Sequence, residues 1–258
     1  MRCTAWHGTR GAFSRLRSTG PEVEAVAAIY KERTKCPAII CTGTGDYRLK
    51  HLQSGADTPP DDRQRAIESP GDGNERDFRC NQALPAPPRV LHLATHGFFL
   101  EKSDRTDRPM TLSGLALAGA NLGMKGETDP DGEDGILYAL EAQNLNLEGT
   151  ELVVLSACDT GKGEVDYSEG VYGLTRAFRT AGARNILMTL WPLLHDELAK
   201  EFMVDFYRNW LSGASGPSGN PTAKTPAEAL RETRLAWIES KDERKCSPRY
   251  WAPYVLIE

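Results

Sequence analysis

Three short, almost continuous apolar runs constrain the fold of this chain more than any other feature of its sequence. They occupy residues 89–95, 151–157 and 185–190. A strand buried on both faces of a parallel sheet has this pattern, whereas a strand with one face in water alternates apolar and polar residues. We therefore expect these runs to be strands inside a mainly parallel sheet.

Helical patterns lie before, between and after these runs. Helices are expected at 21–33, at about 168–181, at 195–211 and at 226–239. Strands that alternate with helices predict a doubly wound α/β fold, in which helices cover both faces of the sheet.

Local signals set the expected ends of several elements. Ser168 is the expected N-cap of the second helix, Gly182 lies just past its end, and Thr225 precedes a first-turn proline in the last helix. Two further strands are expected, a short one at 37–41 and a final one at 250–257.

The length of 258 residues suits one large α/β domain or two small ones. Because the elements on both sides of the flexible connector 213–221 look like one domain, residues 1–258 are expected to form a single domain. Between residues 54 and 88, however, turn-forming and charged residues replace the apolar pattern. Such a composition is typical of disorder. We expect 54–88 to be a disordered insertion that the fold does not need.

The charge balance argues against a nucleic-acid-binding protein. Lys and Arg number 31 against 36 Asp and Glu, a net charge of −5, and binding to a phosphate backbone needs a basic surface. No apolar run approaches the ~20 residues that span a membrane. Neither nucleic acid nor a membrane is therefore an expected partner.

The six cysteines are scattered through the chain without the paired spacing of a zinc site. A chain of this length builds its core without disulfides. We expect no metal, no other cofactor, and an intracellular, cytoplasmic setting in which thiols stay reduced.

Two reactive side chains follow neighbouring apolar runs. The first run ends in Thr95-His96-Gly97 and the second in Ala157-Cys158-Asp159. Ligands of open parallel sheets bind beyond the carboxyl ends of the strands. A thiolate can attack a carbonyl there while an imidazole acts as base and then acid. The amides of Gly97 and Cys158 can form an oxyanion hole.

Other polar residues near these strand ends admit plainer interpretations. Asp159 can tune Cys158 or touch substrate, but a solvated loop carboxylate fits its position equally well. His195 is an alternative base that is expected to begin a surface helix. His92 lies within a buried strand, where a core histidine with satisfied hydrogen bonds is the expected role. The segment Gly161-Lys162-Gly163 lacks the full phosphate-loop pattern.

Two segments of the chain are highly specific, VLHLATHGFF at 90–99 and LVVLSACDTG at 152–161. In these segments the sequence resembles the CHAT family, the caspase-like cysteine peptidase domains often attached to tetratricopeptide repeats. The resemblance continues at EGVYGLTRAF (169–178), AGA (181–183), TLWP (189–192) and YWAPYVL (250–256), and the helix containing EVEA (22–25) is similar to an early helix of the family.

This resemblance implies a caspase-like sheet, with His96 as general base and Cys158 as nucleophile of a cysteine endopeptidase acting on protein or peptide substrates. It also implies that Gly97 helps to hold the oxyanion. Asp196 matches an acidic residue that follows the Trp-Pro segment of the family, and by analogy lines a pocket for a basic residue before the cleaved bond. A helix-capping Asp near the start of the helix after Pro192 is an equal alternative for this residue. Repeat-containing regions or regulatory proteins are the further partners that the family implies.

The chain departs from the family pattern in two places. Only about 20 residues precede the first expected helix, where CHAT domains usually carry more β structure, so an N-terminal truncation is expected. The stretch 54–88 also interrupts a usually short link. Both departures keep open a second hypothesis, a catalytically inactive caspase-like scaffold or protein-interaction module. A nucleotide-binding domain is a third, which lacks its motif.

Overall fold

The computed structural model describes residues 19–38, 40, 87–99, 109–117, 120–128, 134–156, 167–191, 193, 196–213 and 224–258. The expected disordered stretch 54–88 lies outside these residues, except for its last two. Of those, Pro88 accepts a hydrogen bond from the Thr150 hydroxyl through its carbonyl oxygen, at 2.7 Å.

Each of the three apolar runs forms a strand of one four-stranded sheet, sheet A. The strands are β1 (Val90–Leu93), β5 (Leu152–Leu155) and β6 (Asn185–Thr189), and the order across the sheet is β1-β5-β6-β7. β1 pairs with β5 and β5 with β6 in parallel. The prediction of a mainly parallel sheet is thus confirmed.

The last strand, β7 (Tyr254–Ile257), is antiparallel to β6 and shorter than the sequence predicts. The expected strand 250–257 is wrong at its start, because Pro248–Trp251 forms the short helix α9. Pro253 has no N–H to donate to a ladder, so pairing as a full strand begins only after it. Its carbonyl still accepts from the Leu190 amide, at 3.0 Å.

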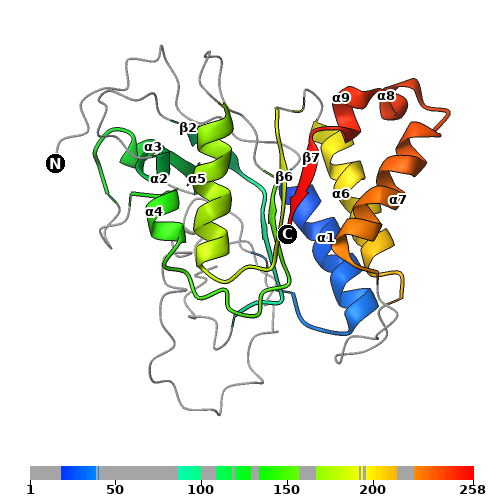
Figure 1. Cartoon of the computed structure of the whole chain (residues 1–258), viewed down its shortest axis with the longest axis horizontal. Coiled ribbons are helices and arrows are strands. Elements are labelled where there is room, and N and C mark those ends of the chain that lie inside the picture. The colour runs from blue at the N-terminus through cyan, green and yellow to red at the C-terminus, as the bar shows by residue number, and fades with distance from the viewer. Residues whose placement is uncertain are drawn as a thin grey trace, which may run out of the picture.

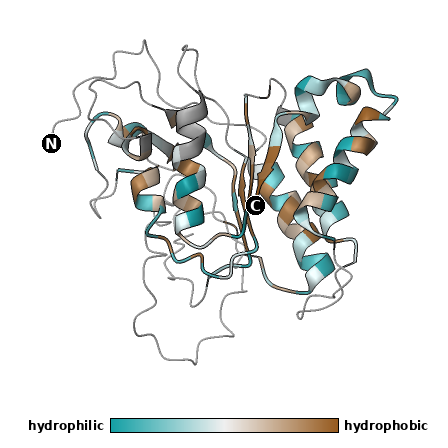
Figure 2. Cartoon of the chain, viewed as in Figure 1, coloured by the Kyte–Doolittle hydropathy of each residue, from teal (hydrophilic) through white to brown (hydrophobic). Residues whose placement is uncertain are grey.

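Helices cover both faces of sheet A, as a doubly wound fold requires (Figure 1). One face carries α1 (Thr19–Thr34), α6 (Asp196–Trp210) and α7 (Pro226–Ile238). The other carries α5 (Tyr167–Thr180). We refer to these as the α1 face and the α5 face. Each of α6 and α7 carries both hydrophobic and hydrophilic residues (Figure 2).

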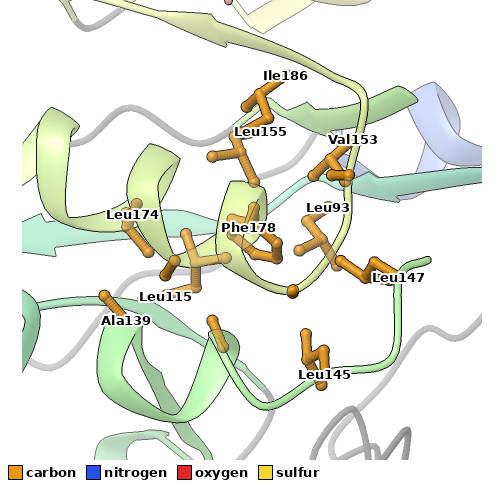
Figure 3. Close-up of a cluster of buried hydrophobic side chains, with 14 of the residues drawn as sticks. Leu93, Leu115, Ala139, Leu145, Leu147, Val153, Leu155, Leu174, Phe178 and Ile186 are labelled. Atoms are coloured by element: carbon orange, nitrogen blue, oxygen red, sulfur yellow. The ribbon is translucent and has the colours of Figure 1, made fainter. Parts of the chain in front are cut away.

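Successive residues of β5 enter different cores. Val153 and Leu155 belong to the cluster on the α5 face, where Phe178 of α5 contributes the largest buried ring (Figure 3). Leu152 and Val154 belong to the cluster on the α1 face. All four β5 side chains are at most 2% exposed. The continuous apolar run is therefore explained by burial on both sides.

A second, three-stranded antiparallel sheet, sheet B, follows directly from β1. Its order is β2-β3-β4, with β2 at His96–Phe99, β3 at Ser113–Ala116 and β4 at Ile136–Tyr138. The expectation that the first strand of the parallel sheet runs on to His96 is therefore wrong. β1 ends at Leu93, and the chain turns into sheet B, where Ala116 pairs with His96.

Four further short helices complete the described elements. They are α2 (Pro109–Leu112), α3 (Ala120–Gly123), α4 (Ala139–Ala142) and α8 (Glu243–Cys246). The expected strand at 37–41 is not seen at Pro37, Ala38 or Ile40, and Ile40 is 39% exposed. Ile39 and Cys41, the other two residues of this prediction, lie outside the described residues. At the described positions the apolar pattern alone does not make a strand, because a strand depends on pairing with a neighbour.

The local end signals are confirmed in two of three cases. Thr225 accepts a hydrogen bond from the Glu228 amide while Glu228 accepts one from the Thr225 amide, a reciprocal capping box. Gly182 has φ 108° just past α5, where a Cβ would meet the Glu148 backbone. Ser168 is not the N-cap of its helix, because α5 already begins at Tyr167.

Candidate functional site

The candidate site lies where β1 and β5 leave sheet A. The two strands are adjacent and in register up to the pair Leu93 and Leu155. One more hydrogen bond, from the Ser156 amide to the Leu93 carbonyl oxygen at 2.9 Å, keeps the two chains together beyond that pair. The sequences that leave this edge therefore start side by side.

His96 follows three residues after Leu93 and is held by the first residues of sheet B. It is 6% exposed and pairs with Ala116 of β3. The Thr95 hydroxyl donates to the Ala116 carbonyl oxygen. Gly97 is buried next to it, opposite Leu115. The backbone that carries the candidate base is thus tied to β3 on both sides of the Thr95–His96 peptide.

The other sequence-predicted site residues are only partly described. Cys158, Asp159 and His195 lie outside the described residues, as does 161–163. Asp196 is the first residue of α6, but its side chain is not described. Of the predicted site residues, the structure thus places His96 and Gly97 side by side at the start of β2, and Asp196 at the start of α6.

The exit of β6, next to β5, has an apolar surface. Leu190 and Trp191 are 38% and 37% exposed. The Trp191 indole N–H donates to the Arg249 carbonyl oxygen at 3.3 Å, which ties this exit to α9. Two partly exposed apolar side chains therefore lie where β6 ends, next to β5.

A buried polar cluster on the α1 face is absent from the sequence predictions. The Nε2 atom of His92, in β1, is 3.0 Å from Oε1 of Glu22 in α1. Its Nδ1 atom is 3.1 Å from the hydroxyl of Tyr207 in α6. The expectation that His92 is a core histidine with satisfied hydrogen bonds is confirmed. Its partners are missing from the sequence interpretation because they lie 70 and 115 residues away.

The one local signal for this cluster is the position of Glu22. Val26 and Ile29 lie four and seven residues further along α1, and all three are buried. A carboxyl group on the buried stripe of a helix needs a partner, because burying it alone is costly. That requirement could have been noticed, but the identity of the partner could not.

Burial raises the pKa of Tyr207 well above its ordinary value of 10.0, and the charges of Glu22 and Tyr30 raise it further. Arg89, the residue before β1, donates a hydrogen bond from Nε to Oε2 of the Glu151 carboxylate, at 2.6 Å. Burial lowers the pKa of Arg89, but the hydrogen bond and charge of Glu151 outweigh it, so the pKa is raised overall. The raised pKa of Tyr207 keeps its hydroxyl protonated at neutral pH, so that this hydroxyl can donate a hydrogen bond.

Among the residues that the structure describes, no group of three or more His, Cys, Asp or Glu side chains is arranged to hold a metal ion. Within the same residues, none of the helices combines the length and apolar character needed to cross a bilayer.

Comparison with known proteins gives one family and two curated relatives. The model of the CHAT domain family matches residues 7–258. Tetratricopeptide repeat protein 28 of Mus musculus is 38% identical over 122 residues, which is 47% of this chain and 4% of the relative. The Homo sapiens protein of the same name is 31% identical over 128 residues, 50% of this chain and 5% of the relative. The matched part spans about one twentieth of these relatives.

Proposed function

The chain belongs to the CHAT domain family, and from this premise we propose that it is a caspase-like cysteine endopeptidase with His96 as general base and Cys158 as nucleophile. Its substrates are proteins or peptides, and the reaction needs no metal or organic cofactor.

The observation that carries this proposal is the in-register parallel pairing of β1 and β5 up to Leu93 and Leu155. His96 and Cys158 each follow three residues after that pair. Neighbouring strands are ~4.8 Å apart, and three residues span at most about 11 Å. A short chain on each side thus suffices to bring imidazole and thiol together.

The chemistry follows from these two residue types. The imidazole of His96 takes the thiol proton of Cys158, and the thiolate attacks the peptide carbonyl carbon. The protonated imidazole then gives its proton to the leaving amine, which leaves a thioester between Cys158 and the acyl half. Water, deprotonated by His96, hydrolyses the thioester and restores the thiol.

The oxyanion of each tetrahedral intermediate needs fixed donors, and the amides of Gly97 and Cys158 are proposed for this role. Gly97 is buried within sheet B, so its amide would not have to reorganise during the reaction.

For the substrate residue before the cleaved bond, Asp196 and, secondarily, Asp159 are the proposed pocket residues. α6 begins at Asp196 after the exit of β6, which is adjacent to β5. A carboxylate there would favour Lys or Arg through a charge-assisted hydrogen bond. Cleavage after apolar residues, unaffected by Asp196→Ala, would remove this part of the proposal.

The test is cleavage of a broad peptide library by the purified protein and by Cys158→Ala. The variant should lose all cleavage and keep its fold, because the loss of sulfur removes the covalent route but changes packing little. Cys36→Ala and Cys246→Ala are matched controls and should cleave like the parent. Circular dichroism and thermal melting separate a broken site from a broken fold. Cleavage by Cys158→Ala at the parent's sites and rate would mean that the nucleophile lies elsewhere.

A second candidate function is a catalytically inactive interaction module. It is supported by the two relatives, both named tetratricopeptide repeat protein 28. Helical repeats of this kind stack into extended surfaces that bind proteins, so a repeat region is the proposed partner. A parent protein that cleaves nothing in the library, and whose Cys158 does not react with an acylating peptide probe, would favour this function.

A further inference from the structure

We propose that Glu22, His92 and Tyr207 form a positioning network that fixes the strand leading to His96. Through this network helix α1 takes part in the candidate active site, with Glu22 and His92 as positioning residues for the His96 imidazole. The inference rests on the proposed function, in which His96 is the general base.

The first step concerns the docking of α1. Its buried stripe consists of Val26, Ile29 and, one turn earlier, Glu22, which is only 3% exposed. A carboxylate loses several kcal/mol of hydration when it is buried, and this loss is offset only by well-placed hydrogen bonds. The described contact of the Glu22 carboxylate is with His92 Nε2, at 3.0 Å. α1 is therefore stable in a position that keeps Glu22 at His92.

The second step concerns the ring of His92. Because the pKa of Tyr207 is raised, we assign its O–H as the donor to Nδ1 of His92. With Nδ1 accepting from Tyr207, we assign Nε2–H of His92 as the donor to Glu22. Both nitrogens of the His92 ring therefore take part in hydrogen bonds. The ring also lies against the Tyr207 ring, with the two ring centroids 5.7 Å apart. The His92 side chain is thus fixed between α1 and α6, two helices from distant parts of the sequence.

The third step leads from His92 to His96. Only three residues separate them. The Leu93 carbonyl oxygen accepts a hydrogen bond from the Ser156 amide, just past β5. The Thr95 hydroxyl donates one to the Ala116 carbonyl oxygen of β3. A backbone held at such short intervals passes a displacement of His92 on to His96. Misplacing a catalytic group by about 1 Å can cost on the order of 100-fold in rate.

The test uses the whole chain and reads His96 directly. The imidazole resonances of isotope-labelled protein are followed by NMR from acid to alkaline pH, and His96 is assigned from His96→Gln. Glu22→Ala and His92→Phe should shift the His96 resonances and change its pKa. Glu22→Gln keeps an acceptor oxygen for Nε2–H and should leave His96 close to the parent.

The matched control is Leu230→Ala, a buried apolar truncation on α7 of the same face. It should lower the melting temperature without changing the His96 titration, which separates positioning from general loss of stability. If His92→Phe does not fold, Tyr207→Phe takes its place, because it removes only one hydroxyl.

An activity measurement adds a second readout. In a parent that cleaves, Glu22→Ala should lower kcat about 10- to 100-fold with little change in KM, because the base and not the substrate pocket is displaced. An unchanged His96 titration in folded Glu22→Ala and in folded His92→Phe or its substitute would overturn the inference. So would an equal change in Leu230→Ala. A parent without cleavage refutes the proposed peptidase only, since the NMR result still decides the positioning role.

Discussion

Both faces of sheet A carry an apolar core, but the α1 face adds a buried polar cluster, and strand β1 contributes to both faces. On the α5 face, Leu93 joins an apolar cluster with Val153 and Phe178 (Figure 3). On the α1 face, His92 forms hydrogen bonds with Glu22 and Tyr207. Apolar contacts have no preferred direction, whereas hydrogen bonds require matched positions and matched donors and acceptors. The comparison indicates that the α5 face supplies stability and the α1 face also supplies alignment.

The largest effect is expected on the α5 face. Phe178 is 0% exposed, so Phe178→Ala should leave a cavity and lower the free energy of unfolding by about 3–5 kcal/mol. Urea denaturation followed by circular dichroism measures the loss. A change below about 1 kcal/mol would contradict the claim that Phe178 fills the apolar core of this face.

On the α1 face, His92→Phe should cost about 3 kcal/mol, because it leaves the Glu22 carboxyl group buried without its partner. The double variant Glu22→Leu with His92→Phe should recover much of this loss, since replacing both partners by apolar groups can be nearly neutral. A double-mutant cycle on denaturation free energies measures the coupling. Additive losses would mean that the two side chains do not depend on each other.

A smaller loss, about 1–2 kcal/mol, is expected for Tyr207→Phe, which removes one hydrogen bond and keeps the aromatic ring. Thermal melting at neutral pH is the measurement. A melting temperature equal to that of the parent would contradict the contribution of the hydrogen bond between Tyr207 and His92.

Tyr207 also gives the α1 face a dependence on pH. Its pKa in the folded chain is raised above the ordinary 10.0, first by burial, and the pKa of Tyr30 is raised as well. Because the pKa of Tyr207 is raised in the folded chain, the stability that this residue contributes is fully present below pH 10.0. This stability is lost as the pH rises through the folded-state pKa. The parent should therefore lose stability above pH 10, and Tyr207→Phe should lose less. Equal alkaline slopes in both proteins would exclude this role of Tyr207.

The smallest effect is expected at the start of α7, where stabilisation is local. Thr225→Ala removes the cap of the Glu228 amide and should cost about 1 kcal/mol. Its effect should add to that of His92→Phe, because the cap shares no partner with the His92 network. Strong coupling between the two variants would show that α7 takes part in the alignment of β1.

The sequence by itself determined the elements whose signals are local. The runs at 89–95, 151–157 and 185–190 predict β1, β5 and β6 because a strand buried on both faces must be apolar at successive positions. Thr225 and Gly182 predict helix ends because capping and left-handed backbone depend on one or two residues. The apolar runs that precede His96 and Cys158 were likewise readable as neighbouring strands that lead to a candidate site. The approach of the two side chains remains a prediction.

Only the tertiary structure decided which distant residues meet. The start of β2 at His96 depends on its partner β3, and Glu22 finds His92 across 70 residues of chain. A helical pattern reports which side of α1 is buried but not what lies opposite, so a glutamate among apolar residues has no partner that the pattern can name. Hydrogen bonds act at about 3 Å, and only folding brings groups from α1, β1 and α6 within that distance.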